Sequence, residues 1–282
     1  MHKVKEGKIM SLLEIEKKAI ERLKAFEPQD GYYLAYSGGK DSDCIKILAQ
    51  LAGVKFEAVH NLTTVDAPET VKYIKAQSDV RIDYPHTSMW KFLFNNQFPP
   101  TRLVRYCCQE LKEKGGQGKV TVTGVRWSES SQRKNNAGLI RIIGKPKGTQ
   151  KIAEELEAEY LITPKGGLIL NDDNDTSRRM VEQCYRTRKT IVNPIIDWSD
   201  EEVWEFLKHY GCNSNPLYSD GKTRVGCIGC PMQSIKSRKE DFVRYPKYMI
   251  NYIKAFERML KAYEKETDWQ SGQDVFDWWI SK

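Results

Sequence analysis

The sequence has 282 residues, of which 40% are hydrophobic and 11% aromatic, so it can bury a core and is not globally disordered. Its formal net charge of +7 favours anionic partners such as nucleotides, nucleic acid or acidic carriers. No window reaches about 18 uninterrupted apolar residues, and the N-terminus lacks a signal-peptide core, so we expect a cytoplasmic protein without a membrane partner.

The first elements alternate between helix and strand. Apolar residues at helical spacing predict a helix over 10–26, which ends before a break at Pro28. Further along the chain we predict a strand, a helix, a strand and a helix, over 32–36, 43–51, 54–61 and 66–78.

Two later β-branched runs predict strands over 120–125 and 191–196. The second leads into a predicted helix over 200–209, where Ser199 and Glu202 have the spacing of a capping box. This alternation predicts an α/β fold with an open, mostly parallel sheet flanked by helices. In such sheets, ligands bind at the carboxyl ends of strands.

The predicted organisation has three parts. An N-terminal helix occupies 1–30, an α/β domain occupies 31–210, and a cysteine-containing loop with C-terminal helices occupies 211–282. Within the α/β domain, residues 135–180 are rich in Gly, Lys, Asn and Asp. We predict that they form an insertion of loops with one helix near 150–158.

The stretch YYLAYSGGKDSDCIKIL, at 32–48, places two glycines, a lysine and an aspartate between a strand and a helix. Such a turn directs backbone N–H groups and the positive end of the helix dipole at an anion. The lysine can reach a phosphate oxygen, and the aspartate can hold Mg²⁺. The predicted phosphate loop comprises Ser37, Gly38, Gly39, Lys40, Asp41 and Ser42. It does not match the Gly-x-x-x-x-Gly-Lys-Ser/Thr pattern.

Four of the seven cysteines form two pairs, Cys107-Cys108 and Cys227-x-x-Cys230. A C-x-x-C turn presents two sulfurs to one metal, and Arg105 and Arg224 nearby favour thiolates. The cysteine content therefore favours metal or redox chemistry over disulfides.

The chain resembles the phosphoadenosine phosphosulfate (PAPS) reductase family of the PP-loop ATP pyrophosphatase superfamily. The resemblance lies in SGGKDS at 37–42, TTVDAPETVKYI at 63–74, YCCQELK at 106–112, TGVRWSESSQR at 123–133, NPIIDWSDEEVWEFL at 193–207 and NPLYSDGKTRVGCIGCP at 215–231. It implies an adenine nucleotide alpha-hydrolase-like fold that binds ATP or a sulfonucleotide (PAPS or adenosine phosphosulfate) with Mg²⁺.

The resemblance also implies site residues and a reaction. Asp66 is expected near the nucleotide or metal, and Gly124 and Arg126 at the phosphates, with Arg133 as a further candidate. Lys40, Asp41 and Arg126 are the expected catalytic residues. In the superfamily a substrate oxygen attacks the α-phosphorus and pyrophosphate leaves.

The two cysteine pairs resemble the [4Fe–4S] ligands of some sulfonucleotide reductases and of the DNA phosphorothioation sulfurtransferase branch, to which this chain is most similar. Four thiolates suit such a cluster. Zinc, or no metal, remain alternatives. A nucleic acid or a sulfur-carrier protein is the implied further partner.

Three functions are compatible with these patterns. The first is cleavage of ATP to AMP and pyrophosphate to activate a substrate, with sulfur transfer to nucleic acid as one use of that activation. The second is sulfonucleotide reduction, disfavoured because no cysteine follows Cys230 in this sequence; Cys184 is the substitute thiol considered. The third is an iron–sulfur accessory protein that binds nucleotide without turnover.

Overall fold

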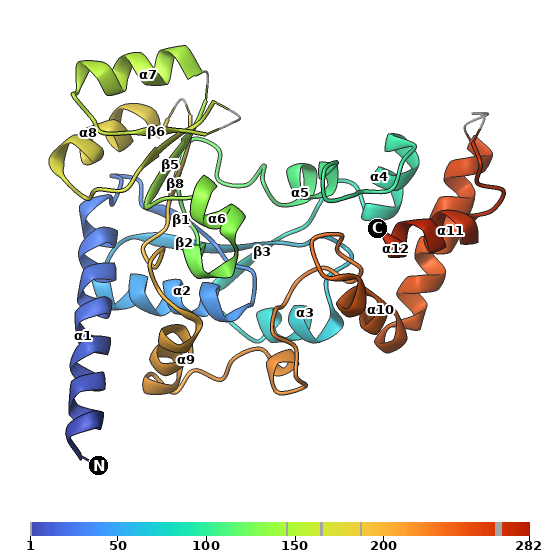
Figure 1. Ribbon diagram of the computed structural model, residues 1–282, viewed down its shortest axis with the longest axis horizontal. Coiled ribbons are helices and arrows are strands. Elements are labelled where there is room, and N and C mark those ends of the chain that lie inside the picture. Colours follow the sequence, from blue (N-terminus) through green and yellow to red (C-terminus); the bar gives the residue numbers. More distant parts are fainter. Residues whose placement is uncertain (1, 145, 164–165, 187, 263–266) are drawn as a thin grey trace.

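The computed structural model describes residues 2–144, 146–163, 166–186, 188–262 and 267–282. These residues form one sheet of eight strands with helices around it (Figure 1). The strand order across the sheet is β3 (Val80–Asp83), β2 (Phe56–Asn61), β1 (Tyr32–Ala35), β4 (Val120–Val122), β8 (Lys189–Val192), β5 (Ile140–Ile143), β7 (Leu168–Leu170) and β6 (Leu161–Ile162).

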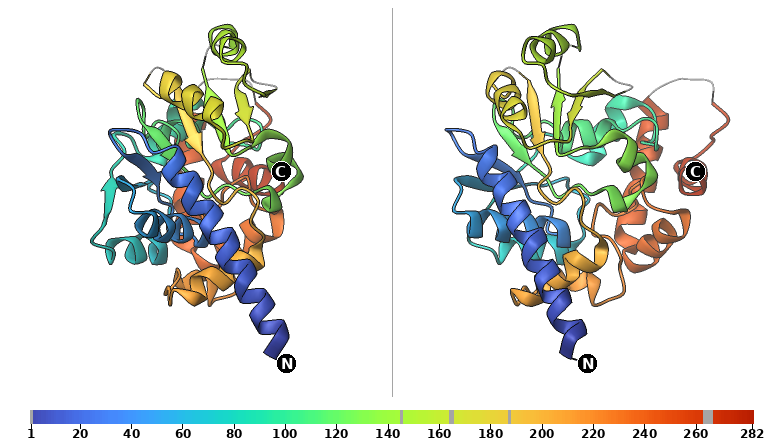
Figure 2. Two further views of the ribbon diagram at one scale, coloured as in Figure 1. Left: turned by 90° about the vertical axis from the view of Figure 1, so that its left-hand side faces the viewer. Right: turned by 60° about the vertical axis from the view of Figure 1, so that its left-hand side comes forward.

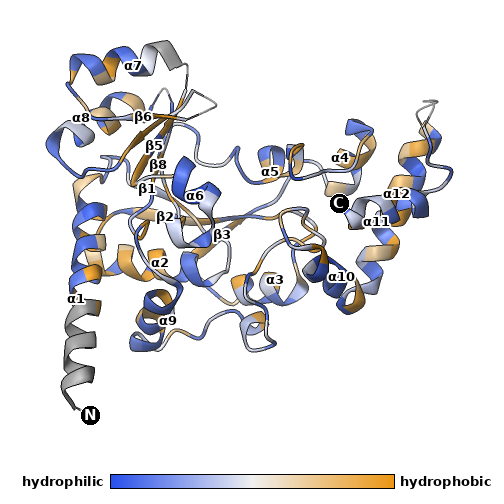
Figure 3. Ribbon diagram, viewed as in Figure 1, coloured by the Kyte–Doolittle hydropathy of each residue, from blue (hydrophilic) through white to orange (hydrophobic). Residues whose placement is uncertain are grey.

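The first five strands in this order are parallel, which confirms the predicted open, mostly parallel α/β sheet. β1 and β4 lie at its centre and are buried, as their aromatic and β-branched residues require. The colouring in Figure 3 shows apolar residues along the central strands.

The prediction for residues 135–180 misses part of the sheet. A helix, α7 (Pro146–Glu155), does lie near 150–158, but β5, β6 and β7 also form there. These strands pair antiparallel and extend the sheet beyond β8. They have only two to four residues each, too few for a periodic pattern to stand out in the sequence.

The N-terminal helix, α1 (His2–Ala25), is longer than predicted and packs against α2 (Lys40–Ala52) and α9 (Asp200–His209), as the views in Figure 2 show. Arg22 of α1 is buried and pairs with Asp197, just before α9, at 2.8 Å. The predicted capping box of α9 is confirmed, because the Ser199 hydroxyl accepts a hydrogen bond from the Glu202 amide.

The remaining helical segments connect the strands or follow the sheet. They are α3 (Pro68–Lys75), α4 (Met89–Asn96), α5 (Tyr106–Leu111), η1 (Trp127–Glu129), α6 (Ser131–Asn136), α8 (Asp175–Cys184), η2 (Pro216–Tyr218), α10 (Ile235–Arg244), α11 (Pro246–Ala262) and α12 (Gly272–Ser281). None of the helices in the described ranges is both long and apolar enough to cross a membrane.

The C-terminal helices build a second hydrophobic core with α4, separate from the core under the sheet (Figure 1). Tyr252, Phe256 and Trp279 are its fully buried aromatic residues. Ile228, from the segment between Cys227 and Cys230, packs into the same cluster. The loop that carries these cysteines is therefore anchored by the C-terminal helices.

The strand order creates a crevice beside β1. The chain leaves β1 toward β2 on one side, and it later returns as β4 on the other side. The loops after β1 and β4 therefore diverge, which is the arrangement that binds ligands in open α/β sheets. Residues 36–39 and 123–126 occupy these two loops.

Candidate functional site

The loop after β1 makes a tight turn into α2. Gly38 has a φ of +71°, and a Cβ atom there would lie 2.9 Å from Ile74, so only glycine fits without strain. Gly39 caps α2, and the Ser42 hydroxyl accepts from the Gly39 amide at 3.1 Å and donates to the Gly39 carbonyl at 2.7 Å. The turn therefore sits at the positive end of the helix dipole.

Four charged side chains meet at the start of α2. The Lys40 ammonium lies 3.5 Å from Asp41 and 3.3 Å from Asp200. The Arg126 guanidinium pairs with the same two carboxylates, at 2.8 Å and 2.5 Å. Partial burial opposes ionisation of Asp200, but the hydrogen bond from Arg126 and the charge of Lys40 hold its pKa below the ordinary value.

Arg126 is fully buried, and four of its five N–H donors are bonded. Besides the two carboxylates, it donates to the Ser128 hydroxyl at 2.7 Å and to the Trp198 carbonyl at 3.2 Å. In this arrangement Arg126 orients Asp41 and Asp200.

Gly124 allows the loop after β4 to approach α2. A Cβ atom on Gly124 would lie 2.8 Å from the Cβ and the carbonyl oxygen of Asp41. The absence of a side chain at this position thus lets Arg126 reach across to Asp41.

Residues 215–218, which are distant from the phosphate loop in sequence, form hydrogen bonds to it. Asn215, buried before η2, donates to the Gly38 carbonyl at 2.9 Å. The Tyr218 hydroxyl accepts from the Lys40 amide at 2.9 Å, and its ring packs edge-on against Trp204 of α9. The backbone N–H of Lys40, in the first turn of α2, is therefore bonded to Tyr218, which lines the adjoining cavity.

A cavity of about 620 Å³ connects the predicted phosphate loop with the paired cysteines. Most of the predicted loop residues line it, together with Gly124, Arg126 and Arg133. The loop residues and paired cysteines in its lining are Ser37, Gly39, Lys40, Asp41, Ser42, Cys107, Cys108, Cys227 and Cys230. Gly38 shapes the turn without lining the cavity. The fold thus brings the phosphate loop and the cysteines to one space.

Asp66 lies buried next to the cysteine loop. Its backbone forms an isolated antiparallel bridge with Cys227, and one carboxylate oxygen accepts from the Thr63 amide at 2.6 Å. The Cys227 sulfur is 4.0 Å from the other oxygen. Asp66 therefore lies at the cysteine side of the site, and it is not part of the charged group at Lys40.

The paired cysteines have unequal surroundings. A hydrogen bond from Cys107, aided by Arg105, lowers the pKa of Cys108 to about 5, and the same interaction with burial raises the pKa of Cys107. Burial raises the pKa of Cys227 to about 11. Among the described residues, no three His, Cys, Asp or Glu side chains form a group that could hold a metal ion.

Lys112 is a cation of this site that the sequence patterns did not identify. Its side chain is exposed to solvent and lines the cavity. The charges of Cys227 and Asp66 raise its pKa above the ordinary value. Lys112 lies one helical turn after Cys108, a spacing that could have signalled it.

The other residues missed from sequence are Asp200, Asn215 and Tyr218. Asp200 follows the predicted capping residue of α9, a position where an acidic side chain has an ordinary structural explanation. The remaining cysteines do not line the cavity: Cys44 and Cys184 are fully buried and Cys212 is half-buried.

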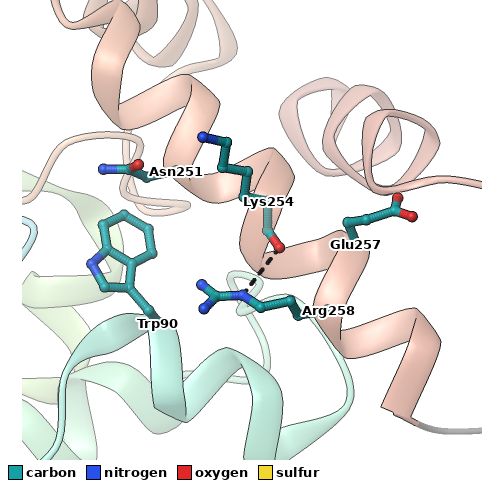
Figure 4. Close-up of a pocket in the computed structure, with 5 residues that line it drawn as sticks. All are labelled: Trp90, Asn251, Lys254, Glu257 and Arg258. Atoms are coloured by element: carbon teal, nitrogen blue, oxygen red, sulfur yellow. Dashed lines mark hydrogen bonds between the residues drawn. The ribbon is translucent and has the colours of Figure 1, made fainter.

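A second hollow of about 430 Å³ lies between α4 and α11 (Figure 4). Trp90, Asn251, Lys254, Glu257 and Arg258 line it, and Arg258 donates to the Lys254 carbonyl. It contains neither phosphate-loop residues nor cysteines. The chemistry that the sequence predicts therefore belongs to the larger cavity.

Comparison with known proteins gives a family match. The family described as "Phosphoadenosine phosphosulfate reductase domain" matches residues 31–233. An uncharacterized protein of Methanocaldococcus jannaschii is 24% identical over 251 residues, covering 88% of this chain and 44% of that protein. The adenosine 5'-phosphosulfate reductase of Allochromatium vinosum is 44% identical over 39 residues, covering 14% and 15% of the two chains.

Among solved structures, the phosphate complex of PAPS reductase from Candida auris is similar, with a TM-score of 0.43 and 13% identity. The match covers 77% of this chain and 93% of that one. The chain spans less than half the length of the two curated relatives named above.

Proposed function

Because this chain belongs to the phosphoadenosine phosphosulfate reductase domain family, we propose that it is an enzyme that cleaves ATP between the α- and β-phosphates. The products are pyrophosphate and a substrate activated by adenylation, which yields AMP when the activated group is transferred. The prediction of the family from sequence is confirmed, whereas this reaction is our proposal.

One observation carries the proposal most strongly. The glycine turn, the N-terminus of α2 and the Lys40 ammonium all lie at one end of a cavity of about 620 Å³. A helix N-terminus with a lysine attracts phosphate through backbone N–H groups and positive charge. The cavity continues from there to the cysteines, which leaves space for a second substrate.

In the reaction, a substrate oxygen attacks the α-phosphorus, and the bond from that phosphorus to the bridging oxygen breaks. The electron pair stays with the departing pyrophosphate. The Lys40 ammonium and the positive end of the α2 dipole stabilise the charge that develops there. Arg126 holds Asp41 and Asp200 in place, so it acts as a positioning residue.

Mg²⁺ fits this site only with ligands from the nucleotide. Asp41 and Asp200 are the carboxylates next to Lys40. Mg²⁺ commonly binds through one or two carboxylates, with phosphates and water completing its shell. Bound Mg²⁺ would neutralise charge on the phosphates.

We further propose that Cys107, Cys108, Cys227 and Cys230 hold a [4Fe–4S] cluster, with zinc as the alternative. Four thiols line one cavity, and Arg105 and Lys112 supply positive charge that favours thiolates. Assembly of a cluster would require the four sulfurs to move closer together. Among the described residues, no three His, Cys, Asp or Glu side chains form a group that could hold a metal ion. A cluster would supply a redox or electrostatic centre at that end of the cavity.

The reductase alternative lacks a suitable thiol among the described cysteines outside the two pairs, which we assign to the cluster. Reduction begins with attack of a thiolate on sulfur. Cys184, the considered substitute, is fully buried, and burial raises its pKa. The accessory alternative, binding without turnover, differs from the proposal only in the absence of products.

The acceptor that we propose is a nucleic acid or a sulfur-carrier protein that receives sulfur after activation. The net charge of +7 supports an anionic partner.

Incubation with Mg²⁺ and α-labelled ATP tests the reaction. We expect AMP and pyrophosphate in equal amounts, and a loss of about 100-fold or more in kcat/KM for Lys40→Ala. Lys46→Ala is the matched control, because Lys46 lies on the same helix but pairs with Asp79 outside the cavity. ADP with phosphate would contradict the proposal, and tight binding without products would support an accessory role.

Anaerobic purification followed by an absorption spectrum and metal analysis tests the cluster. We expect a brown protein with about four irons, and loss of both colour and iron in Cys230→Ser. Cys212→Ser is the control, because this thiol lies outside the cavity. A colourless protein that contains zinc would leave the nucleotide proposal standing and remove the cluster.

A further inference from the structure

The hollow between α4 and α11 is lined by side chains that take no part in the proposed reaction. Its volume of about 430 Å³ lies within the range of ligand-binding sites. One wall is the indole ring of Trp90, and the other is the face of α11 that carries Asn251, Lys254 and Arg258. These three residues are spaced by three and four positions, so they lie on the same side of the helix. Figure 4 shows them around the space that the ring borders.

The two cations of the hollow have no acidic partner among the described residues. Lys254 and Arg258 are exposed, and the Nε atom of Arg258 donates to the Lys254 carbonyl, which leaves the outer guanidinium nitrogens unbonded there. Glu257, the acidic residue of the lining, is already bonded: it accepts from the Gly272 amide at 2.7 Å and pairs with Lys261 at 3.2 Å. Its carboxylate points away from the indole ring in Figure 4. The hollow therefore offers positive charge to an anion.

The Trp90 ring is available for stacking. It is half-buried, and its contact with Tyr252 is edge-on, with the ring centroids 5.0 Å apart and an interplanar angle of 77°. The cation–π contacts of the described residues do not involve this ring. An accessible aromatic ring beside cations suits single-stranded nucleic acid, because the ring stacks with a base while the cations bind phosphates. The Asn251 amide can donate and accept hydrogen bonds at a base edge.

The hollow lies next to the main cavity, across the side chains of α4 and α11. Met89, the residue before Trp90, lines the main cavity, and so does Tyr252, the residue after Asn251. Neighbouring residues of the same two helices therefore line one space or the other. A strand held in the hollow would lie beside the cavity in which we propose that ATP is cleaved.

We propose that the hollow between α4 and α11 binds single-stranded nucleic acid, with a base stacked on Trp90 and phosphates on Lys254 and Arg258. A single strand is required because a paired base cannot leave its stack to reach the ring without a cost in free energy. The inference rests on the proposed function only where it identifies this strand as the acceptor, and there it selects nucleic acid over a sulfur-carrier protein. Binding of the strand itself requires neither ATP nor the cysteines.

Fluorescence anisotropy with a labelled thymidine oligonucleotide of about 15 nucleotides tests the stacking. We expect Trp90→Ala to weaken binding about tenfold, because the stacking of one base is lost, and Trp90→Phe to retain most of the affinity. Trp269→Ala is the matched control, because Trp269 is also half-buried but does not line the hollow. The duplex of the oligonucleotide with its adenosine complement should bind more weakly than the single strand.

The salt dependence of binding tests the two cations. The double variant Lys254→Ala, Arg258→Ala should reduce the slope of log Kd against log salt concentration by about 1.4, because each phosphate contact with a single strand contributes about 0.7. The double variant Lys17→Ala, Lys24→Ala removes the same charge from α1, which lies at the opposite end of the molecule from α11 (Figure 1). We expect this control to leave the slope unchanged.

The outcomes separate this inference from the proposed function. Unchanged affinity in Trp90→Ala overturns the stacking, and an unchanged slope in the Lys254 and Arg258 variant overturns the phosphate contacts. Equal binding of duplex and single strand, or no binding of either by wild type, overturns the inference. Pyrophosphate release from Mg²⁺–ATP without oligonucleotide tests the proposed function separately, because none of the substituted residues lines the main cavity. If Trp90→Ala does not fold, the variant of the two exposed cations still decides the question.

Discussion

Tyr218 shows how a single side chain can modify a phosphate site. Its hydroxyl accepts from the Lys40 amide, which leaves the phenolic hydrogen available to the cavity. A donor polarised in this way is strengthened, because hydrogen bonds in a chain reinforce one another. We therefore expect the hydroxyl to extend the donor set of α2 toward phosphate.

Tyr218→Phe tests this role. We expect about a tenfold loss of affinity for Mg²⁺–pyrophosphate in calorimetry, with a small change in melting temperature. Tyr210→Phe is the control, because the Tyr210 hydroxyl donates to Glu16 outside the cavity. Tighter binding by Tyr218→Phe would mean that the phenol competes with phosphate for the Lys40 amide.

Asp43, in the helix that follows the phosphate loop, makes the free energy of unfolding depend on pH. It accepts hydrogen bonds from Tyr36 and Tyr73, but burial dominates and raises its pKa to about 6. The unfolded value is about 4, so between these values the folded state binds more protons. The free energy of unfolding should therefore fall as pH rises from about 4 to about 6.

The difference between wild type and Asp43→Asn isolates this effect. Denaturant unfolding across that pH range should show wild type losing up to about 2 to 3 kcal/mol relative to the variant as pH rises. His60 contributes the opposite slope, because its lowered pKa makes the folded state bind fewer protons, but this contribution cancels in the difference. Parallel curves would show that Asp43 does not titrate in this window.

At the scale of elements, the site depends on the contact between the loop after β4 and the first turn of α2. Gly124→Ala would place a methyl group 2.8 Å from Asp41. We expect a loss of about 1 to 3 kcal/mol in unfolding free energy and weaker ATP binding, because the loop must move and carry Arg126 with it. Gly226→Ala is the control for stability, because a Cβ atom at that position would have no neighbouring atom within 4 Å. Equal stability of the two variants would contradict the tight packing.

At the scale of the whole molecule, two hydrophobic cores meet at the cavity. The sheet core supports the phosphate loop, and the C-terminal core anchors the cysteine loop through Ile228. The Tyr252 hydroxyl also donates to the Ile228 carbonyl at 3.2 Å. The second core should therefore control exposure of the cysteines independently of the phosphate loop.

Phe256→Ala and Phe206→Ala compare the two cores, because both rings are fully buried. Each substitution should lower the unfolding free energy by about 3 to 5 kcal/mol. Only Phe256→Ala, in the C-terminal core, should speed labelling of Cys227 and Cys230 by a thiol reagent under native conditions. Equal acceleration in both variants would show that the cores open together.

The parts of the fold that were predictable are long or strongly patterned. α2, α9 and the central strands follow from helical spacing, capping residues and β-branched runs. β3 and β5 to β7 were missed because they are short, and α5 because it is a six-residue helix with no apolar stripe. Their formation depends on neighbouring strands and on packing rather than on local propensity.

The family, the parallel α/β sheet and the residues of the phosphate turn could be predicted from the sequence, because glycines, a lysine and a helix start are local features. Only the tertiary structure showed that Asp200 and Tyr218 complete that turn and that Arg126 is buried between two carboxylates. These residues are far apart in the chain, and nothing in a local pattern specifies which distant side chain satisfies a given charge or amide. Strand order and packing of the two cores decide it.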